Sequence, residues 1–201
     1  MRRTLSTRGI LLLTALLAAA VMIGSAALFD AAGWAPRASP VPTEGGGVGP
    51  GYPTVYRNLT IAYDPLAGDY VYTQTQLWVP ADVLVVFTIV NYDPMRATLP
   101  AAGYARVSGT WNEQMQLAYG ANGEMVDGLP TNDVSHTFTM SDSYYQVNVP
   151  IPPAESGGVP ARVTFSLVFH FPGPYFAWGC VAYCGGPQME GMYGSLTVGS
   201  T

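Results

Sequence analysis

The sequence of 201 residues contains no lysine, and only 10% of its residues carry a charge. An ordinary globular domain is about 25% charged. Apolar residues make up 49% of the chain, which excludes overall intrinsic disorder, because disorder needs low hydrophobicity and high charge. From residue 30 onward, five arginines face thirteen acidic residues. This part of the chain should repel phosphate backbones, and we expect no nucleic-acid partner.

The first 29 residues predict a cytoplasmic tip followed by a single transmembrane anchor. Residues 9–29 carry no charge. As a helix they would span about 31 Å, enough for a bilayer core of about 30 Å. Arg2, Arg3 and Arg8 precede this run, which places the N-terminus in the cytoplasm and the rest of the chain outside the cell membrane. A cleaved signal peptide is the alternative interpretation, although its apolar region is usually about 7–15 residues long.

Residues 30–53 read as a linker, because they alternate prolines with glycines and neither residue builds a core. The globular domain is then expected over residues 54–201, which is long enough for one well-buried core. Within it, residues 94–131 are rich in glycine and proline. We expect an inserted hairpin plus a long loop there.

The domain reads as all-β. Apolar and polar residues alternate with a period of two, which is typical of strands, and no sustained period of 3.6 follows the anchor. The pattern predicts strands over residues 71–79, 83–90, 134–140, 163–169, 176–180 and 196–198. A Greek-key β-sandwich is the architecture that such a series of short strands favours.

Cysteine and histidine are scarce, with two of each in the chain. Cys180, Cys184 and Met192 lie on one short segment between two apolar strands, and His136 lies on an apolar strand face. Thiolate, thioether and imidazole ligands suit copper rather than Ca²⁺ or Mg²⁺. A zinc site would require four tight nitrogen or sulfur ligands. His170 has the opposite parity to its apolar neighbours, and we expect it on the surface.

The C-terminal half, from about residue 132 to residue 198, resembles a cupredoxin domain. It is most similar to the binuclear copper (Cu-A) domain of haem–copper oxidase subunit II. Four motifs carry the resemblance: Asp133-Val134-Ser135-His136-Thr137-Phe138, Phe169-x-x-Pro172-Gly173-x-Tyr175, Cys180-x3-Cys184-Gly185 and Met192-Tyr193-Gly194-x-Leu196-x-Val198. Upstream, Val79-Pro80-Ala81-Asp82 resembles the start of a cupredoxin strand. One N-terminal anchor followed by such a domain is also a known layout of subunit II.

The resemblance implies one or two copper ions held by His136, Cys180, Cys184 and Met192. The sequence departs from the family four residues after the second cysteine, where Gln188 replaces a histidine ligand. Met192 follows that position by four residues instead of three. The Gln188 oxygen or the Met189 sulfur would have to replace the missing imidazole. Ala182 stands at the loop glutamate that offers a backbone carbonyl in the family, and any residue has a carbonyl.

The function implied by the resemblance is electron transfer by a membrane-anchored, extracytoplasmic subunit of a terminal oxidase. Its partner would be the haem-bearing subunit I or a redox protein that donates electrons, and the chain would not be a catalyst alone. A mononuclear blue-copper carrier of the sulfocyanin kind is an alternative. A Cu(I) carrier or insertion protein is another, because few histidines and soft sulfur ligands favour the reduced ion. A metal-free surface interaction domain with a Cys180–Cys184 disulfide is the third, since cysteine pairs outside the cytoplasm are usually oxidised.

Overall fold

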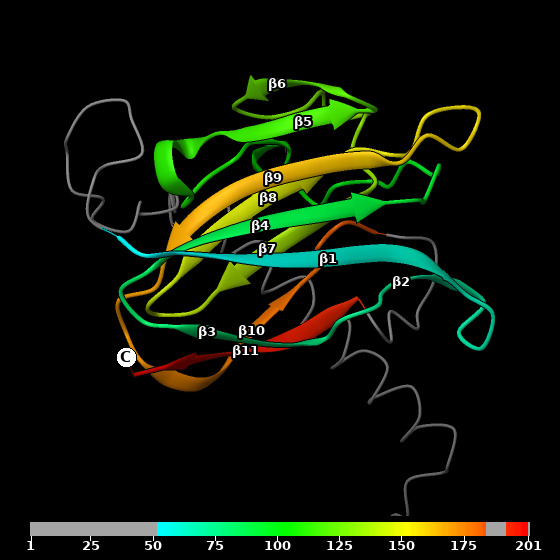
Figure 1. The fold of residues 1–201 in the computed structure, drawn as a ribbon. Coiled ribbons are helices and arrows are strands. Elements are labelled where there is room, and N and C mark those ends of the chain that lie inside the picture. The colour runs from blue at the N-terminus through cyan, green and yellow to red at the C-terminus, as the bar shows by residue number, and fades with distance from the viewer. Residues whose placement is uncertain (1–51, 184–191, 201) are drawn as a thin grey trace, which may run out of the picture. The chain divides into compact units, whose positions relative to one another are not determined.

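The computed structural model describes residues 52–183 and 192–200, and this part of the chain is an all-β sandwich, as expected (Figure 1). One sheet has six strands in the order β2-β1-β4-β9-β5-β6, and the other has five in the order β3-β11-β10-β7-β8. The strands are β1 (Thr54–Asp64), β2 (Asp69–Tyr72), β3 (Gln76–Pro80), β4 (Leu84–Asn91), β5 (Met115–Tyr119), β6 (Asn122–Val126), β7 (His136–Ser141), β8 (Gln146–Ile151), β9 (Ala161–Val168), β10 (Gly173–Gly179) and β11 (Tyr193–Gly199). Two short 3-10 helices, η1 (Ala102–Ala105) and η2 (Trp111–Glu113), lie between β4 and β5.

The expected anchor at residues 9–29 lies outside the described residues and stays a prediction. Within residues 52–183 and 192–200, no helix has the length and the apolar character needed to cross a membrane.

Strand β4 lies between β1 and β9 in the larger sheet, and its apolar run fits that position. Val85, Phe87 and Ile89 are fully buried, and the residues between them are half-buried on the solvent side. Aromatic rings from both sheets fill the core: Phe87 stacks on Phe165 at 5.3 Å, and Phe138 of β7 stacks on Trp178 at 5.2 Å. Burial of these rings joins the two sheets, because aromatic side chains bury large areas and pair favourably.

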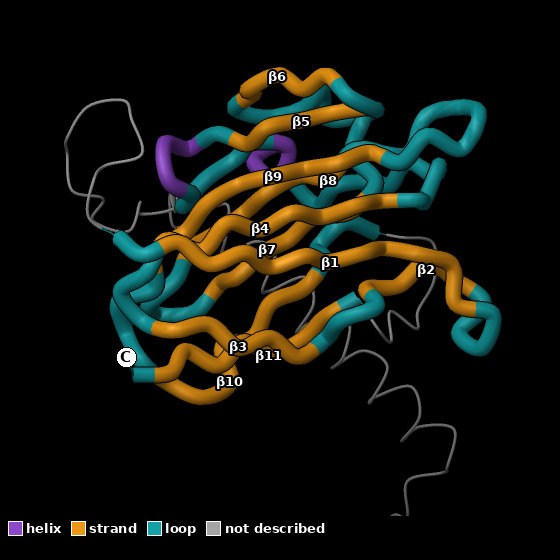
Figure 2. The backbone as a smooth tube through the Cα atoms, in the orientation of Figure 1, coloured by secondary structure: helices purple, strands orange, loops and turns teal. Residues whose placement is uncertain are grey.

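The single strand expected over residues 71–79 is wrong, because the chain crosses between the sheets in the middle of it (Figure 2). The Thr73 backbone N–H donates to the Thr60 carbonyl of the first sheet at 2.9 Å. Two residues later, the Thr75 carbonyl accepts from Ser195 of the second sheet at 2.8 Å. The inward face therefore changes from the even position Tyr72 to the odd position Leu77, both of which are buried. Alternation on each side of the crossing looks alike, so the periodicity does not reveal it.

The segment 94–131 contacts both sheets. The hairpin β5–β6 adds two strands to the larger sheet, with Leu117 of β5 opposite Val163 of β9. Upstream of the hairpin, Ser108 exchanges two backbone hydrogen bonds with Asn148 of β8, the outermost strand of the smaller sheet. Gly109 has φ +70 and lies so close to the Gln146 carbonyl that no side chain fits there. The segment thus covers an edge strand that would otherwise offer unpaired backbone groups.

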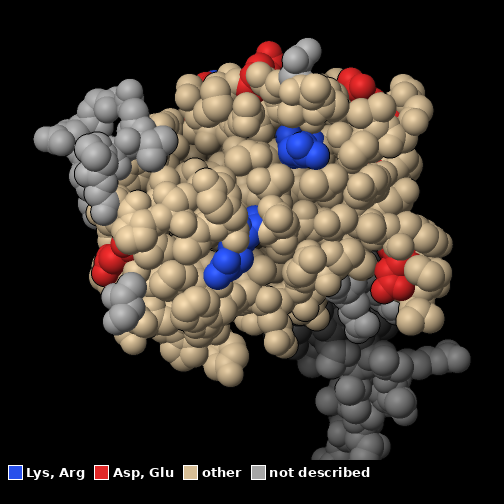
Figure 3. Space-filling model, in the orientation of Figure 1, with Lys and Arg blue, Asp and Glu red and all other residues tan. Residues whose placement is uncertain are grey.

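The solvent face of the larger sheet carries few charges, which matches the composition (Figure 3). One row across its strands consists of Asn58, Thr88, Thr164 and Gln116 in register. The hydroxyls of Thr88 and Thr164 lie 3.3 Å apart. On this face the scarcity of charge is met by neutral polar side chains.

Strand β7 positions the residues that carry chemistry. It pairs antiparallel with β10, with Met140 opposite Trp178 and Thr139 opposite Gly179. Continued by one residue, this register sets Cys180 opposite Phe138, two residues after the start of β7. The Cys180 sulfur reaches the ring of His136, the first residue of β7.

The aromatic core predicts a large loss of stability for Phe138→Ala. Phe138 is fully buried, and removing its ring should lower the free energy of unfolding by about 3–5 kcal/mol. Tyr56→Ala is the matched control, since Tyr56 is 69% exposed and its loss should change stability by less than about 0.5 kcal/mol. Urea unfolding of the full-length chain measures both values. Equal losses in the two variants would contradict this account of the core.

Candidate metal centre

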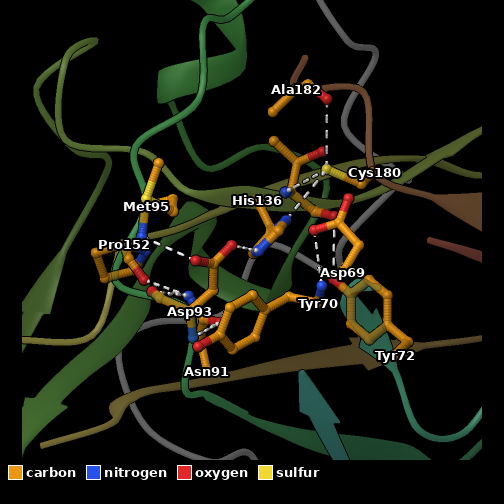
Figure 4. Close-up of polar contacts among 11 residues, drawn as sticks. Asp69, Tyr70, Tyr72, Asn91, Asp93, Met95, His136, Pro152, Cys180 and Ala182 are labelled. Atoms are coloured by element: carbon orange, nitrogen blue, oxygen red, sulfur yellow. Dashed lines mark hydrogen bonds and ion pairs between the residues drawn. The ribbon is translucent and has the colours of Figure 1, made fainter. Parts of the chain in front are cut away.

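His136 is buried to 1% exposure at the start of β7, and both of its ring nitrogens face polar groups (Figure 4). Nε2 lies 2.8 Å from the Asp93 Oδ2 atom. Because a carboxylate only accepts hydrogen bonds, Nε2 carries a proton in this contact. Nδ1 lies 3.9 Å from the Cys180 Sγ atom. The imidazole thus connects a buried carboxylate to a sulfur.

Cys180 is held by backbone groups on two strands. Its N–H donates to the Met192 carbonyl at 2.8 Å, and the Thr137 N–H donates to its Sγ at 3.3 Å. The Val181 N–H donates to the Thr137 hydroxyl at 2.9 Å, which ties the segment after β10 to β7. Sγ also lies 3.8 Å from the Ala182 carbonyl oxygen, the group that the resemblance singles out. Hydrogen bonds to a cysteine sulfur tune the metal that it binds.

Asp93 belongs to the turn after β4, and it is fixed in place by its neighbours. Its Oδ1 accepts from the Met95 N–H at 2.8 Å, and its backbone N–H donates to the Asn91 Oδ1 at 3.0 Å. Asn91, which is fully buried, donates its amide to the Pro152 carbonyl at 2.8 Å. The Ala154 N–H donates to the Asp93 carbonyl at 2.8 Å.

The sequence patterns do not single out Asp93 and Asn91, which follow the strand expected over residues 83–90. A signal was present. Asn and Asp side chains that bind backbone groups two residues on are typical of turns. A pair of them directly after a buried strand places polar groups at the end of the core, where each needs a partner.

The separation of His136 and Cys180 fits two ligands of one metal ion. Bonds of about 2.0 Å to imidazole nitrogen and about 2.3 Å to thiolate sulfur, as at zinc, span 3.9 Å when the angle at the metal is about 130°. An imidazole and a thiol 44 residues apart in the sequence therefore meet in a geometry that an ion could bridge.

The remaining predicted ligands are placed only in part. Met192 is buried in the core, and its carbonyl accepts the Cys180 N–H. Cys184, Gln188 and Met189 lie outside the described residues and stay predictions, as does a Cys180–Cys184 disulfide. In the part of the chain that the structure describes, no group of three or more His, Cys, Asp or Glu side chains could hold a metal ion. Of the expected ligands, the structure thus brings His136 and Cys180 together.

His170 lies away from this centre. It follows β9, whose last residue pairs with the first residue of β4, whereas Asp93 follows the other end of β4. Its Nδ1 is 2.9 Å from the Asp82 Oδ1, and its side chain is 32% exposed. This agrees with the expected surface position.

The environment of His136 favours its protonated form in the metal-free protein. Burial lowers the pKa of His136, but the hydrogen bonds with Asp93 and Cys180 and the charges of both partners outweigh it. The pKa is raised from 6.5 to about 9. A metal ion that binds Nδ1 must therefore displace a proton at neutral pH.

Comparison with known proteins does not assign the chain to a family. No protein-family model matches it, and no curated protein matches it in sequence. Among solved structures it is similar to a multicopper oxidase from Campylobacter jejuni, with 11% identity, a TM-score of 0.41 and coverage of 80% of this chain and 32% of the oxidase. It is also similar to reduced rusticyanin (14% identity, TM-score 0.39, 72% of this chain, 79% of rusticyanin) and to auracyanin B (17% identity, TM-score 0.32, 75% of this chain, 92% of auracyanin B). The chain spans about a third of the length of the oxidase.

The raised pKa of His136 predicts that the metal-free protein loses stability as the pH rises. The pKa of His136 is about 9 in the folded protein and 6.5 in the unfolded chain. Protonation of His136 therefore stabilises the folded protein, and this contribution is complete below pH 6.5. This contribution, about 3 kcal/mol, should disappear between pH 6.5 and pH 9. Urea unfolding at successive pH values in the presence of a chelator measures it. His136→Gln should remove most of the slope, and an unchanged slope in that variant would contradict the assignment.

Proposed function

We propose that this chain is a copper-binding electron-transfer protein of the cupredoxin type, and that His136 and Cys180 are two of its copper ligands. The proposal depends mainly on the partly buried contact of 3.9 Å between the His136 Nδ1 and the Cys180 Sγ. The two residues occupy the positions in the motifs where the resemblance implies copper ligands. Imidazole with thiolate is a donor set that suits copper.

Bound copper would supply a centre that accepts and releases one electron. The chain's own residues would hold the ligands in place. Electron transfer is favoured when the ligands move little as the charge of the ion changes. β7 is buried along both faces from His136 to Met140, so the imidazole cannot swing freely. The Thr137 N–H fixes the sulfur, and Asp93 fixes the ring. These outer contacts orient the ligands and help to keep water away.

At the finer level, we propose that the protein is a subunit-II-like component of a terminal oxidase, anchored by residues 9–29 with its domain outside the cell membrane. The motif Cys180-x3-Cys184 supports this role, because it matches the bridging cysteine pair of the binuclear centre. In this role the chain would pass electrons to a haem-bearing partner subunit.

A mononuclear blue-copper carrier is supported equally well. Among the described residues, the proposed ligands are one imidazole and one sulfur. Both belong to the donor set of a single blue-copper ion. The two functions differ in the number of copper ions. A binuclear centre with bridging thiolates binds two ions and gives an EPR signal with more than four copper lines, whereas a single blue-copper ion gives four.

Copper loading of the full-length chain in detergent tests the proposal. The wild type should bind one or two copper ions and show thiolate-to-copper absorption in the visible range. His136→Ala and Cys180→Ser should abolish the absorption and weaken Cu(II) binding by more than the roughly 10–100-fold that the loss of an outer contact costs. His170→Gln is the matched control and should keep the colour, because His170 binds Asp82 at the other end of β4.

A colourless wild type without bound copper would overturn the proposed function. If its mass also rose by two hydrogens on reduction, a Cys180–Cys184 disulfide in a metal-free interaction domain would replace it. Tight Cu(I) binding with negligible Cu(II) binding would favour a copper carrier over an electron carrier.

A further inference from the structure

We infer that Asp93 is a positioning residue for the copper centre: it directs Nδ1 of His136 toward the metal, and its buried charge favours the oxidised ion. This inference rests on the proposed function. The inference goes beyond the proposed function, because it gives a loop outside the copper motifs a role in setting the redox potential.

The first step concerns the choice of nitrogen. An imidazole can bind a metal through either ring nitrogen, and the partner of the other nitrogen decides which one is used. Nε2 of His136 is engaged by the Asp93 Oδ2 at 2.8 Å, and Nδ1 faces the Cys180 Sγ. Figure 4 shows the ring between the carboxylate and the sulfur. With Asp93 in place, Nδ1 is the nitrogen presented to an ion beside the sulfur.

The second step concerns rigidity. Asp93 is 5% exposed, and its second oxygen accepts the Met95 N–H. The turn that carries it is anchored to the chain after β8, through Asn91 to the Pro152 carbonyl and through the Asp93 carbonyl to Ala154. The residue before Pro152, Ile151, pairs with His136 itself. One compact group of contacts therefore fixes the carboxylate relative to the ring, which is what a metal ligand's outer partner must do.

The third step concerns charge. The nearby Arg96 does not neutralise Asp93 in the structure, because its guanidinium pairs with Asp133 at 3.0 Å. The ion pair that the structure describes for Asp93 is with His136. A buried negative charge acts strongly through the low dielectric of the interior. A carboxylate on the outer nitrogen also makes the imidazole a stronger donor. Both effects stabilise Cu(II) more than Cu(I), so Asp93 should lower the reduction potential.

The test compares Asp93→Asn with the wild type and with Asp127→Asn. Asparagine keeps the size of the side chain and an oxygen that can accept from Nε2, but it removes the charge. Asp127 pairs with Arg106 on the exposed surface and serves as the matched control. Each full-length protein is loaded with copper, and the affinities for Cu(II) and Cu(I) and the reduction potential are measured.

Asp93→Asn should lower the Cu(II) affinity relative to the Cu(I) affinity by about 10-fold or more, because the cost of displacing the His136 proton is the same for both ions. A tenfold difference between the two losses raises the one-electron potential by about 59 mV. Asp127→Asn should change neither quantity. Equal losses for both ions with an unchanged potential would reduce Asp93 to a structural role and overturn the inference while the proposed function stands. A wild type that binds no copper would overturn both.

A measurement on the wild type covers the case in which Asp93→Asn does not fold. Imidazole ¹⁵N NMR should show that the His136 Nε2 keeps its proton when Cu(I) is added, while the Nδ1 resonance shifts. A shift of Nε2 with loss of its proton would show that the metal uses the nitrogen assigned here to Asp93, and would overturn the inference.

Discussion

The antiparallel pairing of β7 with β10 is the constraint on which the candidate centre depends. It sets Met140 opposite Trp178 and Thr139 opposite Gly179, and the next residue, Cys180, then reaches His136 at the start of β7. A slip of one residue would turn His136 to the opposite face of its sheet and take Phe138 out of the core. The aromatic packing of Phe138 against Phe87, Phe165 and Trp178 opposes such a slip. The hydrophobic core and the candidate metal centre are therefore specified by the same pairing.

The buried polar groups at this end of the sandwich form a connected network. A buried charge is costly unless it is paired and hydrogen-bonded. Asp93 meets this requirement through His136 and Met95, and Asn91 meets it through Pro152. Such a network adds little net stability compared with apolar packing, but removal of one partner is expensive. The network also holds the His136 ring in one orientation.

Much of the fold could be predicted from periodicity, because a strand with one buried face repeats apolar residues at every second position. β7, β9 and β11 lie where alternation places them, and β4 lies where the sequence has a nearly continuous apolar run. The crossing at Thr73 could not be predicted in this way, since it changes the sheet and the inward parity without interrupting the polar–apolar pattern. For the centre, the motifs singled out His136 and Cys180 but not Asp93, because a carboxylate after a strand indicates that it needs a partner without showing which partner it meets.

What the sequence determined by itself is the chemistry available: two thiols, two imidazoles and a domain with few charged residues and a two-residue apolar period. These are properties of composition and local order, and they need no knowledge of distant neighbours. Only the tertiary structure decided which imidazole meets the sulfur, and which acid meets the imidazole. His136, Cys180 and Asp93 are each more than 40 residues from the next. Their meeting depends on strand register and on turns tied across two sheets, which are set by packing of the whole core.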